Sequence, residues 1–251
     1  MELAVLAPKS ALSVVSSQKY QIALTSCMDD LTYREFFQIK AELDRYIILQ
    51  QDNRISLEYL IYLSEMVGVS EVILPYIKNR NQETLDIFKE TTREIVIKKK
   101  LSEIVQGLHL SLMVVGQGSP YQITKFVKTA LSDYAAVRSK YSMVFRHPLV
   151  IGLRSSDISN LTSDEVEKLS ASLREVQRRG NCSFHIVDWN GQMSQLRNFK
   201  VRSVSTAIPF QLAVSMTGPL SPGFFDTDFA NGEKERATNL LARIQKNTKD
   251  I

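Results

Sequence analysis

Between residues 109 and 187, short and continuously apolar runs alternate with segments of helical pattern, and this alternation restricts the fold more than any other feature. The runs are His109–Val115, Leu149–Leu153 and Cys182–Val187. Strands that are buried on both faces read as continuous apolar runs, and such strands belong to mainly parallel sheets covered by helices. We therefore predict a small, mainly parallel α/β sheet in this part of the chain.

The segment between the second and third runs carries the clearest helix signals. Thr162 and Glu165 stand three residues apart at its start, where the hydroxyl can cap the amide of Glu165 and the carboxylate can bond back. Apolar residues then recur at helical spacing, at Val166, Leu169, Leu173 and Val176. Gly180 supplies a left-handed stop. We predict one helix over residues 163–179 between two parallel strands.

The first half of the chain is patterned differently, with apolar residues at helical steps and few glycines. One stripe runs from Leu31 to Ile48, Ser56 is placed to cap the next helix, and a long helix is expected over Gln82–Gln106. The long helix is either a core helix of one domain or a dimerisation stalk. Residues 1–27 are apolar and rich in serine, and indicate either one or two strands or a loosely held arm.

The end of the chain places an aromatic segment after a Pro/Gly-rich linker. Three phenylalanines stand among aspartates, at Phe224, Phe225 and Phe229. Burying one such ring contributes on the order of 1.5–3 kcal/mol, so the segment either folds back on the domain or docks on a partner. Fold-back is the default expectation, and the three rings are the candidates for partner docking.

These patterns predict an α/β or α+β protein in three parts. A mostly helical N-terminal region covers residues 1–107, a small, mainly parallel α/β sheet domain covers 108–217, and a linker with a C-terminal helix covers 218–251. The long helix and the phenylalanine segment both offer apolar surface. We therefore expect a homo-oligomer, or a stable hetero-complex with a protein partner.

The composition is that of a soluble globular protein, with 44% hydrophobic and 23% charged residues. The first nine residues form no secretory leader, and no stretch approaches the roughly 18 uncharged residues of a membrane helix, so no membrane association is expected. Cys27 and Cys182 have no paired spacing, which favours reduced thiols and a cytoplasmic location. The net charge of +4 permits contact with nucleic acid without demonstrating it.

Residues 57–80 resemble a degenerate helix-turn-helix. Gly68 stands where the turn needs a residue that tolerates positive φ. The second helix would carry Glu71 where base-reading side chains are usually Arg, Asn or Gln, and Pro75 would interrupt it. A helical hairpin used for packing is therefore favoured over sequence-specific DNA binding.

Motifs that would name a reaction are weak. Gly116-Gln117-Gly118 precedes a helix, as in a dinucleotide-binding loop, but Tyr121 replaces the third glycine, so no cofactor is expected. The histidines lack a carboxylate or thiol at ligand spacing, so no metal site is expected. Asp188 stands at the carboxyl end of a strand, where ligand sites of α/β proteins form, although capping of the following turn is the commoner role.

Residues 108–217 are similar to the STAS domain of anti-sigma-factor antagonists in the order of their segments. The matching segments are Leu110–Gly116, Leu149–Leu153, Asp157–Ser163, Leu173–Gly180 and Phe184–Val187. The resemblance implies that the module engages another protein and that Thr162 or Ser163 accepts a phosphoryl group. Asn160-Leu161-Thr162 stands where the family has an Asp-Ser pair.

Basic residues gather in the last third of the chain. The nucleic-acid-binding candidates are Arg174, Arg178, Arg179, Arg197, Lys200 and Arg202. If these residues share one face, that face can contact the phosphates of a nucleic acid independently of its base sequence. The alternative is that they form an ordinary solvated helix surface. The preferred function is a non-enzymatic regulatory or protein-interaction protein. Basic nucleic-acid binding is the alternative, and a nucleotide-dependent enzyme ranks third.

Overall fold

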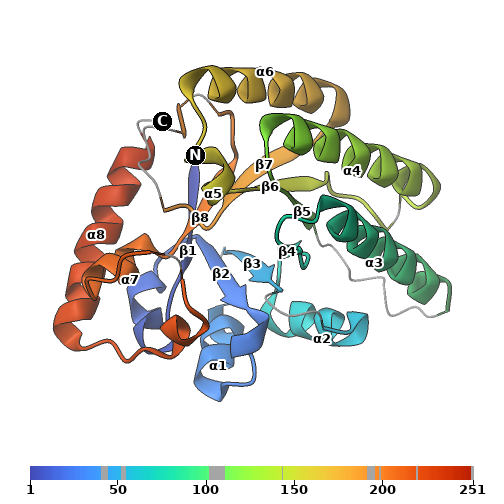
Figure 1. The fold of residues 1–251 in the computed structure, drawn as a ribbon. Helices are drawn as coiled ribbons and strands as arrows, with labels where there is room; N and C mark the ends of the chain where they lie inside the picture. Colours follow the sequence, from blue (N-terminus) through green and yellow to red (C-terminus); the bar gives the residue numbers. More distant parts are fainter. Residues whose placement is uncertain are drawn as a thin grey trace.

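The strands of this protein close into a barrel. The computed structural model describes residues 1–40, 45–51, 55–101, 111–142, 144–190, 196–197, 199–218 and 220–249. The strands are β1 (Glu2–Leu6), β2 (Tyr20–Leu24), β3 (Tyr46–Gln50), β4 (Glu71–Ile73), β5 (Ser111–Gly116), β6 (Val150–Arg154), β7 (Ser183–Val187) and β8 (Ser203–Thr206). Each strand pairs in parallel with the next one along the chain, and β8 pairs in parallel with β1. The result is a closed, eight-stranded parallel barrel (Figure 1).

Helices surround the barrel, as Figure 1 shows. The longer ones are α1 (Leu31–Lys40), α2 (Leu57–Val67), α3 (Asn81–Leu101), α4 (Pro120–Lys140), α6 (Ser163–Gly180) and α8 (Asn231–Lys249). Shorter pieces are α5 (Ser155–Ile158), α7 (Ile208–Ala213) and the 3₁₀ turns η1 (Lys9–Val15), η2 (Thr25–Cys27) and η5 (Pro222–Asp226). The connection from β1 to β2 is η1, and α8 packs beside it and beside β1. This is the (β/α)₈, or TIM-barrel, architecture.

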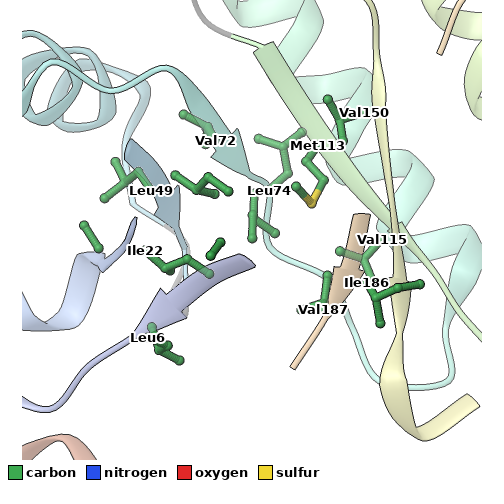
Figure 2. Close-up of a cluster of buried hydrophobic side chains, with 14 of the residues drawn as sticks. Leu6, Ile22, Leu49, Val72, Leu74, Met113, Val115, Val150, Ile186 and Val187 are labelled. Carbon is green, nitrogen blue, oxygen red and sulfur yellow. The ribbon is translucent and has the colours of Figure 1, made fainter. Parts of the chain in front are cut away.

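Apolar side chains fill the core around these strands. Figure 2 shows a cluster contributed by strands from all round the barrel, including Leu6, Ile22, Leu49, Met113 and Ile186. All of these are buried. A small parallel barrel has an interior just wide enough to be filled by side chains, so its middle is a packed core. Ligands therefore have to bind at an end of the barrel.

The predicted helix between two parallel strands is confirmed. It is α6, and the Thr162 side chain and the Glu165 carboxylate form the capping box. The helix ends at Gly180, but the left-handed residue is Asn181, with φ of 44°. The flanking strands β6 and β7 are adjacent and parallel, with Ile151 opposite Phe184.

The predicted fold class is wrong, because the region expected to be helical supplies four barrel strands. β3 occupies the end of the stripe that indicated a helix, where Ile47 and Ile48 are fully buried in the sheet. The helix-turn-helix interpretation is also wrong, since Gly68 ends α2 in a left-handed conformation and Glu71 begins β4. Two strands within residues 1–27, one of the two alternatives, are present as β1 and β2. The last five residues of the long helix expected up to Gln106 lie outside the described residues.

The phenylalanine segment folds back, as expected by default. Phe224 and Phe229 are buried, and the ring of Phe229 meets that of Phe210 edge-on at 5.8 Å between centroids. Ser10 ties this segment to η1, because its hydroxyl donates to the carbonyl of Thr227 at 2.8 Å and accepts from the amide of Phe229 at 3.0 Å. None of the described helices has the length and apolar character needed to cross a membrane.

Candidate active site

The carboxyl ends of all eight strands meet at one end of the barrel, and polar side chains gather there. In a parallel barrel this end is formed by the loops after the strands, and it is where such barrels hold their ligand sites. Polar side chains at or just after the carboxyl ends of the strands include Lys9, Ser26, Gln50, Tyr76, Arg154 and Asp188.

Two cavities open among these side chains. The first, about 220 Å³, is lined by residues after β4, β6 and β7, including Tyr76, Arg154, Ser155 and Asn190. The second, about 470 Å³, is lined by residues after β1, β2 and β3 and by η5, including Lys9, Ser26, Cys27, Gln50, Phe225 and Asp226. Asp188 and Leu220 line both cavities. The Asp188 carboxylate therefore stands where the two cavities meet.

Asp188 is held in an uncommon backbone conformation. Its φ is 55°, a value that a non-glycine residue adopts at a cost of about 1–3 kcal/mol. Two hydrogen bonds to Ser205 fix this turn: the Asp188 amide donates to the hydroxyl at 3.0 Å and the Trp189 amide donates to the carbonyl at 2.7 Å. The backbone strain is thus maintained by β8, and it aims the carboxylate over the end of the barrel.

The Asp188 carboxylate is half-buried, and no described residue donates a hydrogen bond to it. Burial raises its pKa to about 6, an effect that the positive charge of Arg154 partly opposes. A carboxyl group with that pKa changes its protonation state within about one pH unit of neutrality. It can therefore both accept and release a proton under ordinary conditions.

Arg154 is positioned by a buried amide. Its Nη1 donates to Oε1 of Gln117 at 2.8 Å, and Gln117 is only 1% exposed. The same Oε1 accepts from the Asn79 amide at 3.0 Å, while Nε2 of Gln117 donates to the Ile77 carbonyl at 2.9 Å. A guanidinium has five N–H donors, so this one bond orients Arg154 and leaves donors for a ligand.

Tyr76 faces the same charges. Burial raises its pKa to about 12, the negative charges of Asp188 and Asp157 add to the shift, and Arg154 opposes it. The phenol is thus neutral at physiological pH and keeps a proton to donate in a hydrogen bond. Across the cavity, the Ser155 hydroxyl donates to Oδ1 of Asn190 at 2.8 Å, which joins the loops after β6 and β7.

The glycine loop after β5 is closely packed by its neighbours. A side chain at Gly116 would come within 2.8 Å of the Phe126 ring, and the Gln122 side chain packs beneath Gly118. The Gly118 amide already donates to Oδ2 of Asp157 at 3.1 Å. The buried residue of this loop, Gln117, supports Arg154.

The other predicted site residues lie elsewhere. Thr162 caps α6, where its hydroxyl also donates to Glu165 at 2.9 Å, and Ser163 is exposed in the first turn of that helix. Neither residue lines either of the two cavities at the carboxyl end. Of the docking candidates, Phe224 and Phe229 are buried, whereas Phe225 lines the second cavity.

The structure disperses the basic residues. Arg178 and Arg179 both pair with Glu175 on α6, whereas Arg174 and Lys200 line a small groove between α6 and the chain before β8. Arg197 is exposed. Arg202 turns into the amino end of the barrel and binds the fully buried carboxylate of Glu71, with one N···O distance of 2.7 Å.

Three members of the site had no signal of their own in the sequence. Tyr76 and Gln50 follow strands whose residues have a helical pattern, and Arg154 ends a strand where a dinucleotide-binding domain would carry an acid. The position of Asp188 after a strand was the one feature that marked this end of the fold. Among the described residues, no group of three or more His, Cys, Asp and Glu side chains is arranged to hold a metal ion.

Among known proteins, the chain resembles solved structures in fold. No protein-family model and no curated protein matches the chain. A solved structure of a variant of the citrate synthase SbnG matches with a TM-score of 0.50 and 13% identity, covering 85% of this chain and 91% of that one. An HpcH/HpaI aldolase from Desulfitobacterium hafniense DCB-2 has a TM-score of 0.48 at 10% identity, with 85% and 89% covered. At such identities the likeness concerns the fold alone.

These findings correct the expected function. The STAS resemblance is wrong, because the segments that carried it are strands and helices of a closed barrel. The expectation of a non-enzymatic regulatory protein rested on that resemblance and is withdrawn with it. The order strand, helix, strand was interpreted correctly, but it belongs to a larger closed sheet.

Proposed function

We propose that this protein is an enzyme that moves a proton to or from a small anionic substrate at the carboxyl end of its barrel. Asp188 is the acid–base group, and Arg154 binds the anion. The observation that carries the proposal is the position of the Asp188 carboxylate at the junction of two cavities. No described residue hydrogen-bonds to this carboxylate, and its pKa is about 6. An efficient catalytic acid or base has a pKa near the operating pH.

Arg154 gives the first cavity its preference for anions. Its guanidinium is permanently charged and presents donors in a planar fork that matches carboxylate and phosphate oxygens. The bond to Gln117 fixes the direction of that fork before a ligand arrives. Such preorganisation lowers the entropy lost on binding.

The chemistry follows from these positions. With the anionic group at Arg154, the Asp188 carboxylate removes a proton from the carbon beside a substrate carbonyl. The C–H bond breaks, an O–H bond forms on Asp188, and the electron pair moves to the carbonyl oxygen. The neutral Tyr76 phenol donates a hydrogen bond to that oxygen as its negative charge develops. In the reverse direction Asp188 returns the proton.

Exchange of hydrogen with solvent tests this step by itself, separately from any later step of the reaction. The protein is incubated in D₂O with a panel of small 2-oxo acids and hydroxylated sugar acids, and deuterium at the carbon beside the carbonyl is followed by NMR. We expect exchange with at least one compound, slowed about 10²–10⁴-fold in Asp188→Asn. The exposed Asp228→Asn serves as the matched control and retains the wild-type rate. Exchange that is equal in wild type and Asp188→Asn would contradict the assignment.

Location and assembly are further proposals. Cys27 and Cys182 are both buried and form no disulfide, which favours a reducing compartment such as the cytoplasm. Assembly into a homo-oligomer or a hetero-complex stays a prediction, and with Phe224 and Phe229 buried in the chain it depends on other surfaces, such as the half-exposed Ile97 on α3. Light scattering of the full-length chain measures it directly.

A further inference from the structure

Apart from Asp188 at the junction, the second cavity contains polar groups but no uncompensated charge. Its one cation, Lys9, donates from Nζ to Oδ1 of Asp226 at 2.6 Å, so the two charges neutralise each other. The remaining polar wall consists of Ser26, Cys27, Ser221 and the amide of Gln50, apart from Asp188 at the junction. Leu6, Leu24 and Phe225 supply apolar surface. A second anion would therefore have to displace Asp226 to find a cation.

Gln50 is the unusual member of this wall. Its Oε1 is buried, and no described residue hydrogen-bonds to either atom of its side-chain amide. An unsatisfied buried polar atom costs about 1–3 kcal/mol, so such atoms in native proteins call for an explanation. A free amide offers two N–H donors and one acceptor oxygen, which is complementary to a hydroxyl group that both accepts and donates. A purely apolar ligand would leave the amide unpaired.

The geometry points to a subsite for a hydroxylated carbon chain in the second cavity, with Gln50 as its specificity-determining residue. The substrate is then a sugar-like chain that carries an acidic group, a carboxylate or a phosphate, at one end. The acidic end lies at Arg154, the reacting carbon lies beside Asp188, and the hydroxyl groups reach Gln50 and Ser26. This inference rests on the proposed function, because Arg154 is what anchors the acidic end.

The apolar side chains of the cavity agree with such a ligand. The carbon atoms of a hydroxylated chain carry C–H groups that pack on apolar walls, while the hydroxyl groups bond to amide, hydroxyl and carboxylate partners. Sites that pair a substrate hydroxyl strongly disfavour the analogue that lacks it, because the buried polar partner is then left unsatisfied. The preference should therefore appear as a difference between matched ligands.

Calorimetric titration of the full-length protein with matched ligands tests the subsite. D-gluconate is compared with hexanoate, and D-glucitol 6-phosphate with hexyl phosphate, so that each pair differs in hydroxyl groups and shares its acidic group. We expect the hydroxylated member of at least one pair to bind about tenfold more tightly or better, which corresponds to about 1.4 kcal/mol. The pair with the larger difference identifies the acidic group as a carboxylate or a phosphate.

Variants separate the subsite from the anion site. Gln50→Leu should bring the affinity ratio within each pair close to one and leave the affinity for the alkyl anion unchanged. Gln50→Asn, which keeps the amide and is milder for folding, should give an intermediate ratio. Gln82→Leu, on the exposed side of α3, is the matched control and keeps the wild-type ratio. Arg154→Met should weaken both members of a pair by the same factor.

The outcomes are distinct. If the alkyl anions bind as tightly as the hydroxylated ones, the subsite is refuted, while loss of both in Arg154→Met still supports the anion site. If no anion depends on Arg154 but neutral D-glucitol binds through Gln50, the proposed function falls and the subsite remains. If no ligand depends on either residue, both are wrong.

Discussion

The two ends of the barrel hold their buried polar groups in opposite ways. At the amino end, Glu71 accepts from the Tyr46 hydroxyl at 2.7 Å and from Arg202 at 2.7 and 3.0 Å. At the carboxyl end, Asp188 and Gln50 receive no hydrogen bond at their side chains from a described residue and face cavities. Polar groups that satisfy one another stabilise a fold, whereas groups held open to a cavity are available to a ligand. The comparison assigns structure to one end and chemistry to the other.

His185 lies beside the structural end, and its buried Nε2 has no hydrogen-bond partner among the described residues. Its Nδ1 lies 2.8 Å from the hydroxyl of Ser203, and it lines neither cavity. Burial lowers its pKa to about 3, and the positive charge of Arg202 adds to the effect, so the imidazole is neutral in the folded protein. Arg202 itself keeps its charge: burial lowers its pKa, but the carboxylate of Glu71 more than compensates and raises it.

The largest expected effect is at the amino end. Arg202→Met leaves the Glu71 carboxylate buried without its cation, and we expect the free energy of unfolding to fall by about 3–5 kcal/mol. The double variant that combines Arg202→Met with Glu71→Gln should recover much of the lost free energy of unfolding, because no charge is then buried. Denaturant unfolding measures both. A loss below about 1 kcal/mol for Arg202→Met would show that this ion pair does not define a structural end.

The two ends should also respond oppositely to pH. The pKa of His185 is about 3 when folded against 6.5 ordinarily, so the unfolded chain binds the extra proton and stability falls as pH drops through that window. The pKa of Asp188 is about 6 against 3.8, so the folded chain binds the proton and stability falls as pH rises from about 4 to 6. Asp188→Asn should remove the second slope and His185→Leu the first, in unfolding titrations at each pH. If these substitutions leave the dependence of stability on pH unchanged, folding does not shift the pKa values of the two groups.

A smaller effect is expected where the carboxyl end has its own structural support. Gln117→Leu removes the acceptor that orients Arg154, and the affinity for hexyl phosphate should fall about tenfold in calorimetric titration. Gln117→Asn keeps a neutral amide acceptor and should retain more of the affinity than Gln117→Leu. If both variants bind as wild type does, Arg154 is positioned by other contacts.

The smallest effect concerns neither end. Thr162→Ala removes the cap of α6 and should lower the free energy of unfolding by about 0.5–2 kcal/mol without altering ligand affinity. Thr162→Ser retains the capping hydroxyl and should stay near wild type in the same denaturant titration. A change in ligand affinity would link α6 to the site and weaken the contrast between the two ends.

Strands in the second half of the barrel could be predicted from the sequence, whereas β3 and β4 in the first half could not. β5, β6 and β7 are runs of five or six residues separated by well-capped helices. The alternation of strand and helix could therefore be recognised in the sequence. β4 has three residues, and β3 ends a stripe that has helical spacing, so local pattern favoured helix at both. Closure depends on β8 pairing with β1, about 200 residues away, and no local signal encodes that contact.

The candidate site could be predicted only in part, because only some of the strands that carry it were recognised in the sequence. Asp188 follows β7, a strand that the sequence identified, so its position at the carboxyl end was visible. Tyr76 follows β4 and Gln50 ends β3. Neither strand was recognised in the sequence, and the convergence of the two residues on Asp188 depends on closure of the barrel. The support of Arg154 by Gln117 joins residues 37 positions apart and required the structure.

The pKa of Asp188 tests the central claim most directly. Carboxyl-carbon NMR of the aspartate-labelled protein, with the Asp188 resonance assigned by its absence in Asp188→Asn, follows this one group through pH. We expect a titration midpoint at about 6, which the addition of D-gluconate or D-glucitol 6-phosphate shifts in the wild type but not in Arg154→Met. A midpoint near the ordinary 3.8, indifferent to both anions, would mean that Asp188 is a solvated turn residue and that the carboxyl end holds no acid–base group there.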